Sequence, residues 1–214
     1  MQACHEVTDV PSPSLSFLVY RENLIRSRSR RLFDAVMAAV SIIIIAPILA
    51  IAALAILLED GQPIFFAQRR VGRFERPFLM WKLRTMHRID CEDRPSPRSA
   101  ADPRITRVGR ILRRFSVDEL PQFYNVLRGD MALVGPRPEM PFIVKRYEPW
   151  QHLRHLVRPG LTCLWQVELR STVPLDRAEA TALDLEYIRN ASPRLDGALI
   201  ARTLVALVRP KGAF

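Results

Sequence analysis

The segment VMAAVSIIIIAPILAIAALAILL, Val36–Leu58, decides the architecture of this chain because it contains no charged residue. It is long enough for an α-helix to cross a bilayer, which takes about 20 apolar residues. Pro47 lies near its middle, where a proline removes a backbone hydrogen bond and kinks a helix. The segment is therefore read as a membrane element, either a plain spanning helix or a helix bent at Ala46-Pro47. A buried helix of a soluble protein is the weaker third interpretation.

Basic residues flank this segment on both sides. The arginines are Arg21, Arg26, Arg28, Arg30 and Arg31 before it, and Arg69, Arg70 and Arg73 after it. A spanning helix typically has asymmetric flanks, whereas two basic flanks favour a helix that enters and leaves on one side, with its arginines among anionic head groups. The pattern alone leaves both topologies open. Asp34, just inside the entry, is expected to pair with a neighbouring arginine.

The 214 residues carry a formal charge of +10, and the length fits one compact domain plus a membrane element. This charge indicates an anionic partner: nucleic acid, an acidic membrane surface or a phosphorylated substrate. Only three of the 32 basic residues are lysine, and the planar fork of arginine suits phosphate oxygens. A GC-rich genome would give the same arginine bias, so charge does not choose among these partners.

We divide the chain into a polar, arginine-rich tail (1–30), a membrane helix (31–60) and a compact domain (61–214). The tail does not resemble a cleavable signal, because it is too long before the apolar core and no small-residue cleavage site follows. The cysteines are Cys4, Cys91 and Cys163. They form no Cys-x-x-Cys pair and do not combine with the histidines at zinc-site spacing, so we expect no structural metal, no disulfide framework and a reducing compartment.

Short apolar runs after the membrane segment predict a small hairpin, with strands at 63–66 and 78–81 around the polar turn 71–77. Proline, serine and aspartate predict a loop over 91–103. Helical spacing of apolar residues predicts a helical region over 105–127.

Within that helical region, Ser116 stands three residues before Glu119, which predicts a capping box at a helix start. A second interpretation is chemical. A helix N-terminus binds phosphate and favours an ionised carboxylate, so Asp118 could attack a phosphorus atom while Glu119 holds a divalent cation. The two interpretations do not exclude each other.

Further along, Arg137 lies between Pro136 and Pro138, which fix the backbone and lower the entropy cost of presenting a guanidinium to a phosphate. A tight turn with a solvated arginine is the alternative. Arg158, before Pro159-Gly160, repeats the arrangement, and 165–167 is predicted to be a short strand. The apolar stretch 195–208 predicts an amphipathic helix, against the membrane or on the core. Three polar residues near it are interpreted as ordinary surface and interface groups: Asp184, Tyr187 and Asp196.

From about Arg31 to Val208 the chain resembles the bacterial sugar transferase family, the monotopic polyprenyl-phosphate phosphoglycosyl transferases. The resemblance rests on an ordered set of motifs: Asp102-Pro-Arg-Ile-Thr-Arg-Val-Gly109, Asp118-Glu-Leu-Pro-Gln122, Asn125-Val-Leu-Arg-Gly-Asp-Met131 and Val134-Gly-Pro-Arg-Pro-Glu139.

The resemblance implies site residues by matching positions. Asp118 is then the catalytic nucleophile and Glu119 a Mg²⁺ ligand. Arginines at 113 and 137 hold substrate phosphates. Lys82, Arg84 and Thr85 form a basic segment near the site, of which Lys82 and Arg84 are expected to bind substrate phosphates too. Arg158-Pro-Gly160 matches a further signature, counted here with the phosphate-binding residues. The bent segment matches a re-entrant helix broken at Pro47, and with this resemblance we expect re-entrant rather than spanning geometry.

The fold implied is α+β and mainly helical: a re-entrant helix and a compact cytoplasmic catalytic domain with short strands and interfacial amphipathic helices. The implied reaction transfers a sugar 1-phosphate from a UDP-sugar to undecaprenyl phosphate through an aspartyl intermediate. UMP is released, in the first membrane step of exopolysaccharide, capsule or O-antigen synthesis. Mg²⁺, with Mn²⁺ as an alternative, is the implied cofactor. Anionic lipids of the bacterial inner membrane are implied partners, and nucleic acid is not.

Two departures from the family pattern stand out. Ala46 precedes the kink proline where serine is frequent, and Glu168-Leu169-Arg170 replaces a small Gly-Arg step, which bears on sugar recognition. One alternative to an enzyme is a catalytically dead membrane adaptor. The other is a basic nucleic-acid-binding protein, for which no nucleic-acid-binding motif is found. The sequence does not fix the donor sugar, the pathway or the oligomeric state.

Overall fold

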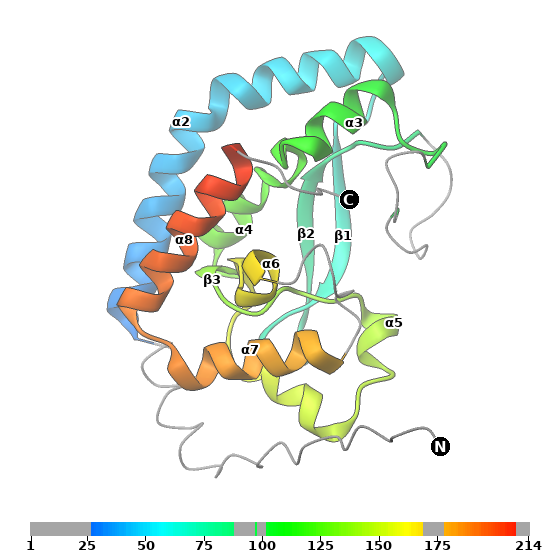
Figure 1. Cartoon of the computed structure of the whole chain (residues 1–214). Coiled ribbons are helices and arrows are strands. Elements are labelled where there is room, and N and C mark those ends of the chain that lie inside the picture. The colour runs from blue at the N-terminus through cyan, green and yellow to red at the C-terminus, as the bar shows by residue number, and fades with distance from the viewer. Residues whose placement is uncertain (1–26, 88–96, 98–101, 169–177, 209–214) are drawn as a thin grey trace, which may run out of the picture.

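The computed structural model describes residues 27–87, 97, 102–168 and 178–208, and helices predominate among them (Figure 1). The elements in chain order are α2 (Arg28–Asp60), β1 (Phe65–Val71), η1 (Arg73–Glu75), β2 (Pro77–Leu83), α3 (Arg107–Arg114), η2 (Val117–Glu119), α4 (Gln122–Arg128), β3 (Ala132–Val134), α5 (Pro141–Val144), η3 (Pro149–Leu156), β4 (Gly160–Thr162), α6 (Leu164–Glu168), α7 (Ala178–Asn190) and α8 (Pro193–Val208). The predicted α+β class, mainly helical with short strands and a long apolar N-terminal helix, is confirmed.

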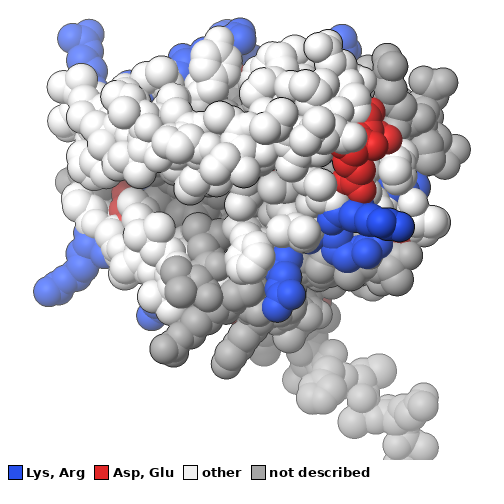
Figure 2. All heavy atoms as spheres, turned by 90° about the horizontal axis from the view of Figure 1, so that it is seen from above, with Lys and Arg blue, Asp and Glu red and all other residues white. Residues whose placement is uncertain are grey.

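Helix α2 is a single helix of 33 residues with Pro47 inside it. Figure 1 shows it bent near its middle, where proline removes a helical hydrogen bond, so that it runs along one side of the body and then over its top. It is long and apolar enough to cross a membrane, and 11% of its most apolar window is buried. The face on which its second half lies is largely free of charged side chains, which gather at the edges (Figure 2).

Both halves of α2 pack on the same body. Ala38, in the first half, belongs to the main core with residues of β2, α4, β3, α7 and α8. Ala52 and Ile56, in the second half, form a second cluster with Leu83 and Leu112. The buried faces are therefore short stripes, and most of the remaining large apolar side chains of α2 are exposed.

The predicted hairpin is confirmed, with longer strands than the sequence indicated. Strands β1 and β2 pair antiparallel from Phe65 opposite Leu83 to Val71 opposite Pro77. The turn between them contains Phe74 and Glu75, both in left-handed backbone conformation with φ of 54° and 58°.

The helical region predicted over 105–127 is divided into α3, η2 and α4. The capping box predicted at Ser116 is wrong: Ser116 has a φ of 54° and its side chain makes no cap hydrogen bond. A left-handed residue ends the run of helical dihedrals, so the chain turns there. As a result Asp118 and Glu119 lie in a tight turn between two short helices.

Strands β3 and β4 pair parallel, Ala132 with Gly160 and Val134 with Thr162. A Cβ atom at Gly160 would lie 2.1 Å from the backbone nitrogen of Gly135, so glycine is required for this close approach. The strand predicted at 165–167 is wrong. That stretch belongs to α6, since the strand of this region ends at Thr162.

The C-terminal stretch is helical as predicted. In α8, Leu199 is fully buried while Leu204 and Val205 are exposed, so this helix packs on the core with part of its length. The predicted loop at 91–103 falls largely outside the described residues, as do Cys4 and Cys91, the N-terminal tail up to residue 26, and Leu169-Arg170.

Candidate active site

The polar turn η2 places Asp118 beneath the second half of the hairpin, opposite the basic residues of β2 and α3. The carboxyl is 7% exposed. Within the part of the chain that the structure describes, no hydrogen bond reaches it. Burial raises its pKa, an effect opposed by the charges of Lys82, Arg113 and Arg137 and reinforced by Glu119. A buried carboxylate that faces three cations without a fixed partner is free to bond to an incoming atom.

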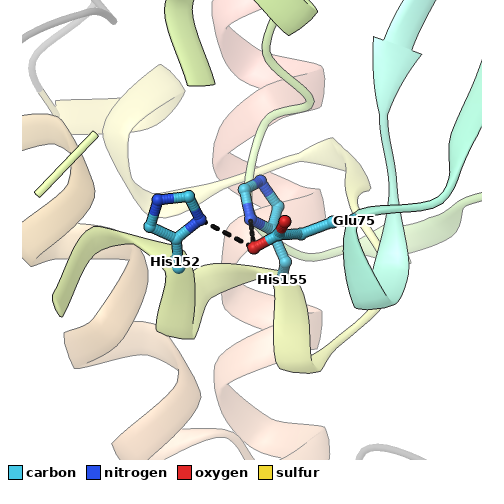
Figure 3. Close-up of side chains that lie close together, drawn as sticks. All are labelled: Glu75, His152 and His155. Carbon is cyan, nitrogen blue, oxygen red and sulfur yellow. Dashed lines mark hydrogen bonds and ion pairs between the residues drawn. The ribbon is translucent and has the colours of Figure 1, made fainter. Parts of the chain in front are cut away.

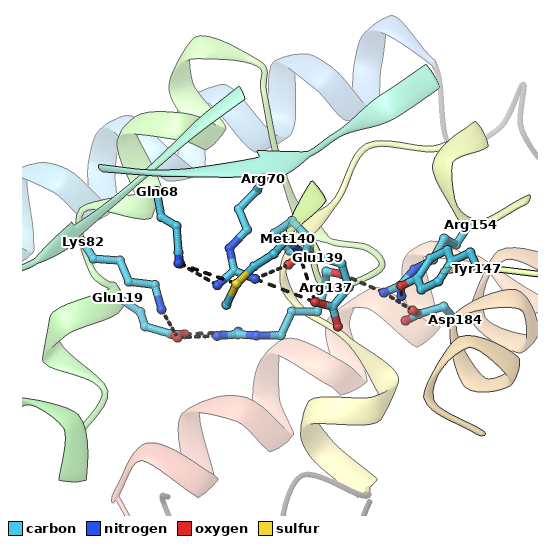
Figure 4. Close-up of polar contacts among 11 residues, drawn as sticks. Gln68, Arg70, Lys82, Glu119, Arg137, Glu139, Met140, Tyr147, Arg154 and Asp184 are labelled. Atoms are coloured by element: carbon cyan, nitrogen blue, oxygen red, sulfur yellow. Dashed lines mark hydrogen bonds and ion pairs between the residues drawn. The ribbon is translucent and has the colours of Figure 1, made fainter. Parts of the chain in front are cut away.

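Glu119 is, in contrast, fully engaged. It accepts a hydrogen bond from Lys82 Nζ at 3.1 Å, and its two oxygens accept from both terminal nitrogens of Arg137, Nη1 at 3.2 Å. Arg137 Nη1 also donates to Gln166 Oε1 at 2.9 Å. Burial lowers the pKa of Lys82, and Glu119 and Asp118 oppose this shift. Figure 4 shows Lys82 and Arg137 converging on Glu119 from opposite sides.

Arg113 completes the site from α3. Its Nε donates to Thr85 Oγ1 at 2.8 Å, and among the described residues its terminal nitrogens make no further hydrogen bond. Burial lowers its pKa, which Asp118 and Glu119 oppose. The site thus brings together three cations and two carboxylates, a positive surplus that suits a phosphorylated substrate.

The loop that presents Arg137 is held by two buried arginines (Figure 4). Arg70 Nη1 donates to the carbonyl of Pro138 at 3.1 Å, and Arg154 Nη2 donates to the carbonyl of Arg137 at 2.7 Å. Arg154 is ion-paired with Asp184 at 2.5 Å, with both side chains 1% exposed. These contacts fix the guanidinium of Arg137 before any substrate binds.

Comparison with known proteins identifies the family of this chain. The family described as bacterial sugar transferase matches residues 25–210. This chain belongs to the bacterial sugar transferase family. The transferase is 46% identical over 195 residues to the UDP-glucose:undecaprenyl-phosphate glucose-1-phosphate transferase of Caulobacter vibrioides, covering 86% of this chain and 72% of that protein.

Two further relatives differ in length. The UDP-N-acetylgalactosamine-undecaprenyl-phosphate N-acetylgalactosaminephosphotransferase of Aeromonas hydrophila is 34% identical over 208 residues, which are 95% of this chain but 47% of that protein. The exopolysaccharide production protein ExoY of Rhizobium meliloti is 32% identical over 201 residues, 87% of this chain and 88% of that protein. The transferase therefore matches most of the length of the first and third of these relatives and about half of the second.

Not every predicted site residue lies at this centre. The structure brings Lys82, Arg113 and Arg137 to Asp118 and Glu119. Arg84 points elsewhere: it donates to the carbonyls of Asp60 at 2.9 Å and Gly61 at 2.6 Å and pairs with the Asp60 carboxylate at 3.0 Å.

Arg158 lies near the other end of α2, within electrostatic range of Asp34. Among the charges acting on Asp34, Arg30 has the largest effect, but the ion pair that Arg30 makes is with Asp196 at 2.9 Å. Pro47 is exposed within the apolar helix and remote from the chemistry in sequence and in packing.

The interpretation of Asp184, Tyr187 and Asp196 as ordinary surface and interface groups is wrong for the first two. Asp184 and Tyr187 are 0% and 1% exposed. Tyr187 donates to Asp196 at 2.8 Å and accepts from Arg30 at 2.6 Å. Arg70 is buried rather than placed among head groups as the sequence predicted, and Arg154, which no motif singles out, is buried too. Nothing in the neighbourhood of either residue distinguishes a buried arginine from a solvated one.

Proposed function

We propose that this transferase moves a sugar 1-phosphate from a UDP-sugar to undecaprenyl phosphate and releases UMP, as the first membrane step of an exopolysaccharide-type synthesis. The relatives' names support a nucleotide-sugar donor and this lipid acceptor. The observation that carries the proposal is the state of Asp118, a buried carboxylate that has no hydrogen-bond partner among the described residues and lies beside three cations. Such a group is poised to act as a nucleophile.

In the first step, an oxygen of Asp118 attacks the phosphorus atom bonded to the sugar. The bond between that phosphorus and the bridging oxygen breaks, and the electron pair leaves with UMP. Arg113 and Arg137 lie where they can hold the diphosphate oxygens, and a preorganised cation offsets charge in a transition state without reorganisation. The product of this step is a sugar phosphate joined to Asp118 as an acyl phosphate, a mixed anhydride.

In the second step, a phosphate oxygen of undecaprenyl phosphate attacks the same phosphorus atom. The acyl phosphate bond to Asp118 breaks and the carboxylate is restored, giving a sugar-diphosphate-undecaprenol. Two displacements at one phosphorus replace a single transfer between two anions, and each requires only one substrate in place.

The two carboxylates also fit a magnesium site. Mg²⁺ prefers oxygen ligands and is usually held by one or two carboxylates together with substrate phosphates. Glu119, with Asp118 adjacent, is the residue we propose to hold it, with Mn²⁺ as an alternative ion. When bound, the ion would offset negative charge on the diphosphate. Lys82 and Arg137, which neutralise Glu119 in this structure, would then be available to hydrogen-bond phosphate oxygens, with Arg137 kept in place by its loop.

The packing of α2 supports a re-entrant topology with the catalytic domain on the cytoplasmic face. A straight helix of this length would measure about 50 Å, enough to cross a bilayer of about 30 Å. The two halves instead contact one body, so both ends of the helix lie on the same side. The exposed arginines before and after the helix, Arg28 and Arg69, are then placed among anionic head groups.

The test is UMP release by detergent-purified protein with Mg²⁺ and undecaprenyl phosphate, from a panel of UDP-sugars headed by UDP-glucose because of the Caulobacter relative's name. Asp118→Asn should lower turnover by at least about 10³-fold, as removal of a catalytic nucleophile does. Without the lipid acceptor, wild type should release about one equivalent of UMP and gain the mass of one sugar phosphate.

Glu186→Gln is the matched control, since it also converts a carboxylate to an amide but lies exposed on α7. Equal turnover by Asp118→Asn and wild type would remove Asp118 as the nucleophile. A wild type that turns over without ever gaining mass would replace the two-step route with direct transfer. If no UDP-sugar of the panel gives UMP release, the proposed substrates are refuted, while the family membership stands.

A further inference from the structure

A second group of chemically active side chains lies outside the active site, at the tip of the hairpin. Glu75, His152 and His155 each aim a ligand atom into one space, and these atoms lie within 4.8 Å of one another (Figure 3). His152 Nδ1 is 2.6 Å and His155 Nδ1 3.9 Å from Glu75 Oε1. Two of the chain's four histidines thus lie beside one carboxylate, which precedes His152 by 77 residues.

Local geometry brings the three together. The histidines are three residues apart on η3, and side chains at this spacing eclipse each other in a 3₁₀-helix, so both rings lie on one face. Glu75 is presented by the strained left-handed turn of the hairpin. Backbone strain of this kind costs about 1–3 kcal/mol and persists where the surroundings fix it. The turn and η3 are therefore held in one relative position.

His155 supplies an observation independent of this clustering. Its side chain is 8% exposed, and its Nδ1 atom is buried with no hydrogen-bond partner. A buried polar atom without a partner costs about 1–3 kcal/mol. This nitrogen points at Glu75 from too far for a hydrogen bond, so a ligand placed between them would satisfy both.

We propose that Glu75, His152 and His155 form a binding site for a transition-metal ion of the Zn²⁺ class, separate from the magnesium site at Glu119. Two imidazole nitrogens and one carboxylate oxygen are a ligand set that Zn²⁺ takes, with water in the fourth position. The exposed side of Glu75 leaves room for that water. Mg²⁺ is disfavoured because it prefers oxygen ligands only.

The adjustment required is small. Tetrahedral Zn²⁺ with bonds of about 2.0–2.1 Å places neighbouring ligand atoms about 3.3 Å apart. The short contact to His152 would open and the long contact to His155 would close, each by rotation of the Glu75 side chain. Tyr147 stacks on His155 at 6.1 Å between ring centroids and an interplanar angle of 15°, which restrains the buried ring.

Bound metal would cross-link the hairpin tip to η3. His155 lines a small hollow together with Arg137 and Arg154, and Arg154 holds the backbone of Arg137. The site therefore braces the loop behind the active site without contacting substrate. Metal binding at this site is therefore expected to stabilise the fold, and changes to its residues are expected to lower the affinity for the metal.

The experiment titrates Zn²⁺, and Co²⁺ as its spectroscopic substitute, into full-length protein stripped of metal and carrying no histidine tag, without substrates. Wild type should bind one equivalent, with the visible absorption of tetrahedral Co²⁺. At about 100 times the dissociation constant, the Tm should rise by about 5–10 °C. Excess Mg²⁺ should not displace the ion.

Glu75→Gln and His152→Gln test the site by changing an exposed and a half-exposed side chain, so both variants should fold. Each should weaken binding by at least about 100-fold, more than loss of an outer-shell residue does. His87→Gln is the control, because this exposed histidine hydrogen-bonds Asp60 at 2.8 Å far from the cluster.

Binding that is equal in wild type and in both site variants would overturn the proposal. So would a Tm that Zn²⁺ leaves unchanged in wild type while the variants unfold at the same temperature. In that case the 2.6 Å contact is an ordinary hydrogen bond that ties the hairpin to η3. None of these readouts depends on the transfer reaction, so failure of the proposed function would leave this test intact.

Discussion

The two ends of α2 are attached to the same body by opposite charges. At its N-terminal end, Arg31 donates to the last backbone carbonyls of α4 at 2.8 and 2.6 Å. At its C-terminal end, Glu59 accepts from the first two backbone amides of α3, both at 2.8 Å. Each charge complements the helix end that it contacts. Because α3 and α4 flank the turn that carries Asp118, the bent helix holds both sides of the active site.

The two attachments differ in depth. At the N-terminal end, Arg30 joins Asp196 and Tyr187 in a network that is mostly buried, and the neighbouring Asp34 is 4% exposed. At the C-terminal end, Glu59 is exposed and the hydrogen bonds it accepts lie at the surface. We infer that the first end is part of the core and that the second can separate at lower cost.

The largest expected effect is at Arg30. Arg30→Met removes the ion pair to Asp196 at 2.9 Å and the hydrogen bond to Tyr187 at 2.6 Å. It leaves a largely buried carboxylate without its cation, so the free energy of unfolding should fall by about 3 kcal/mol. Unfolding by denaturant in detergent measures it. Arg28→Met, at an exposed position of the same helix, should change it by less than about 0.5 kcal/mol. Equal losses of unfolding free energy in Arg30→Met and Arg28→Met would contradict the conclusion that Arg30 is a buried anchor of α2.

A smaller loss is expected at Arg84, which holds the other end. Arg84→Met removes hydrogen bonds to two backbone carbonyls and the ion pair to Asp60. Charge-assisted bonds contribute about 1.5–3 kcal/mol, and the exposed carbonyls can turn to water. The free energy of unfolding should fall within that range, while kcat/KM for the UDP-sugar stays close to wild type. A loss of turnover without a loss of stability would restore the phosphate-binding role that the family resemblance gave Arg84.

Sequence reasoning succeeded where a local pattern has one physical cause. An uncharged run interrupted by Pro47 predicts a bent apolar helix, and alternating apolar runs around a polar turn predict the hairpin. The residues around Asp118 were found through the motif, and the structure brings Lys82, Arg113 and Arg137 to it. None of these conclusions needed knowledge of distant contacts.

It failed where the partner is remote in the sequence. Arg84 and Arg137 are both arginines that the family resemblance places near the site, yet one binds backbone at the end of α2 and the other binds Glu119. Asp184 was taken for a surface residue because its ion-pair partner, Arg154, stands 30 positions earlier. Ser116 has the spacing of a capping box, but its left-handed backbone turns the hydroxyl away from the amides that it would cap. In each case tertiary packing selected among local options of similar energy.

The smallest expected effects test whether the two attachments of α2 act together. Glu59→Gln and Arg31→Gln each remove a charge from a helix end but keep a polar group there. Each should lower the free energy of unfolding by about 0.5–1 kcal/mol, and less at high salt. Unfolding of both variants and of the double variant at two ionic strengths provides the measurement.

If the two sites were independent, the losses of unfolding free energy in the single variants would add up to that of the double variant within about 0.5 kcal/mol. We expect instead that the double variant loses less than the sum, because releasing either end of α2 lets the bend relax and frees the other. Strict additivity would contradict this coupling, and it would mean that α3 and α4 are each held at Asp118 by their own contacts with the body rather than by the bent helix.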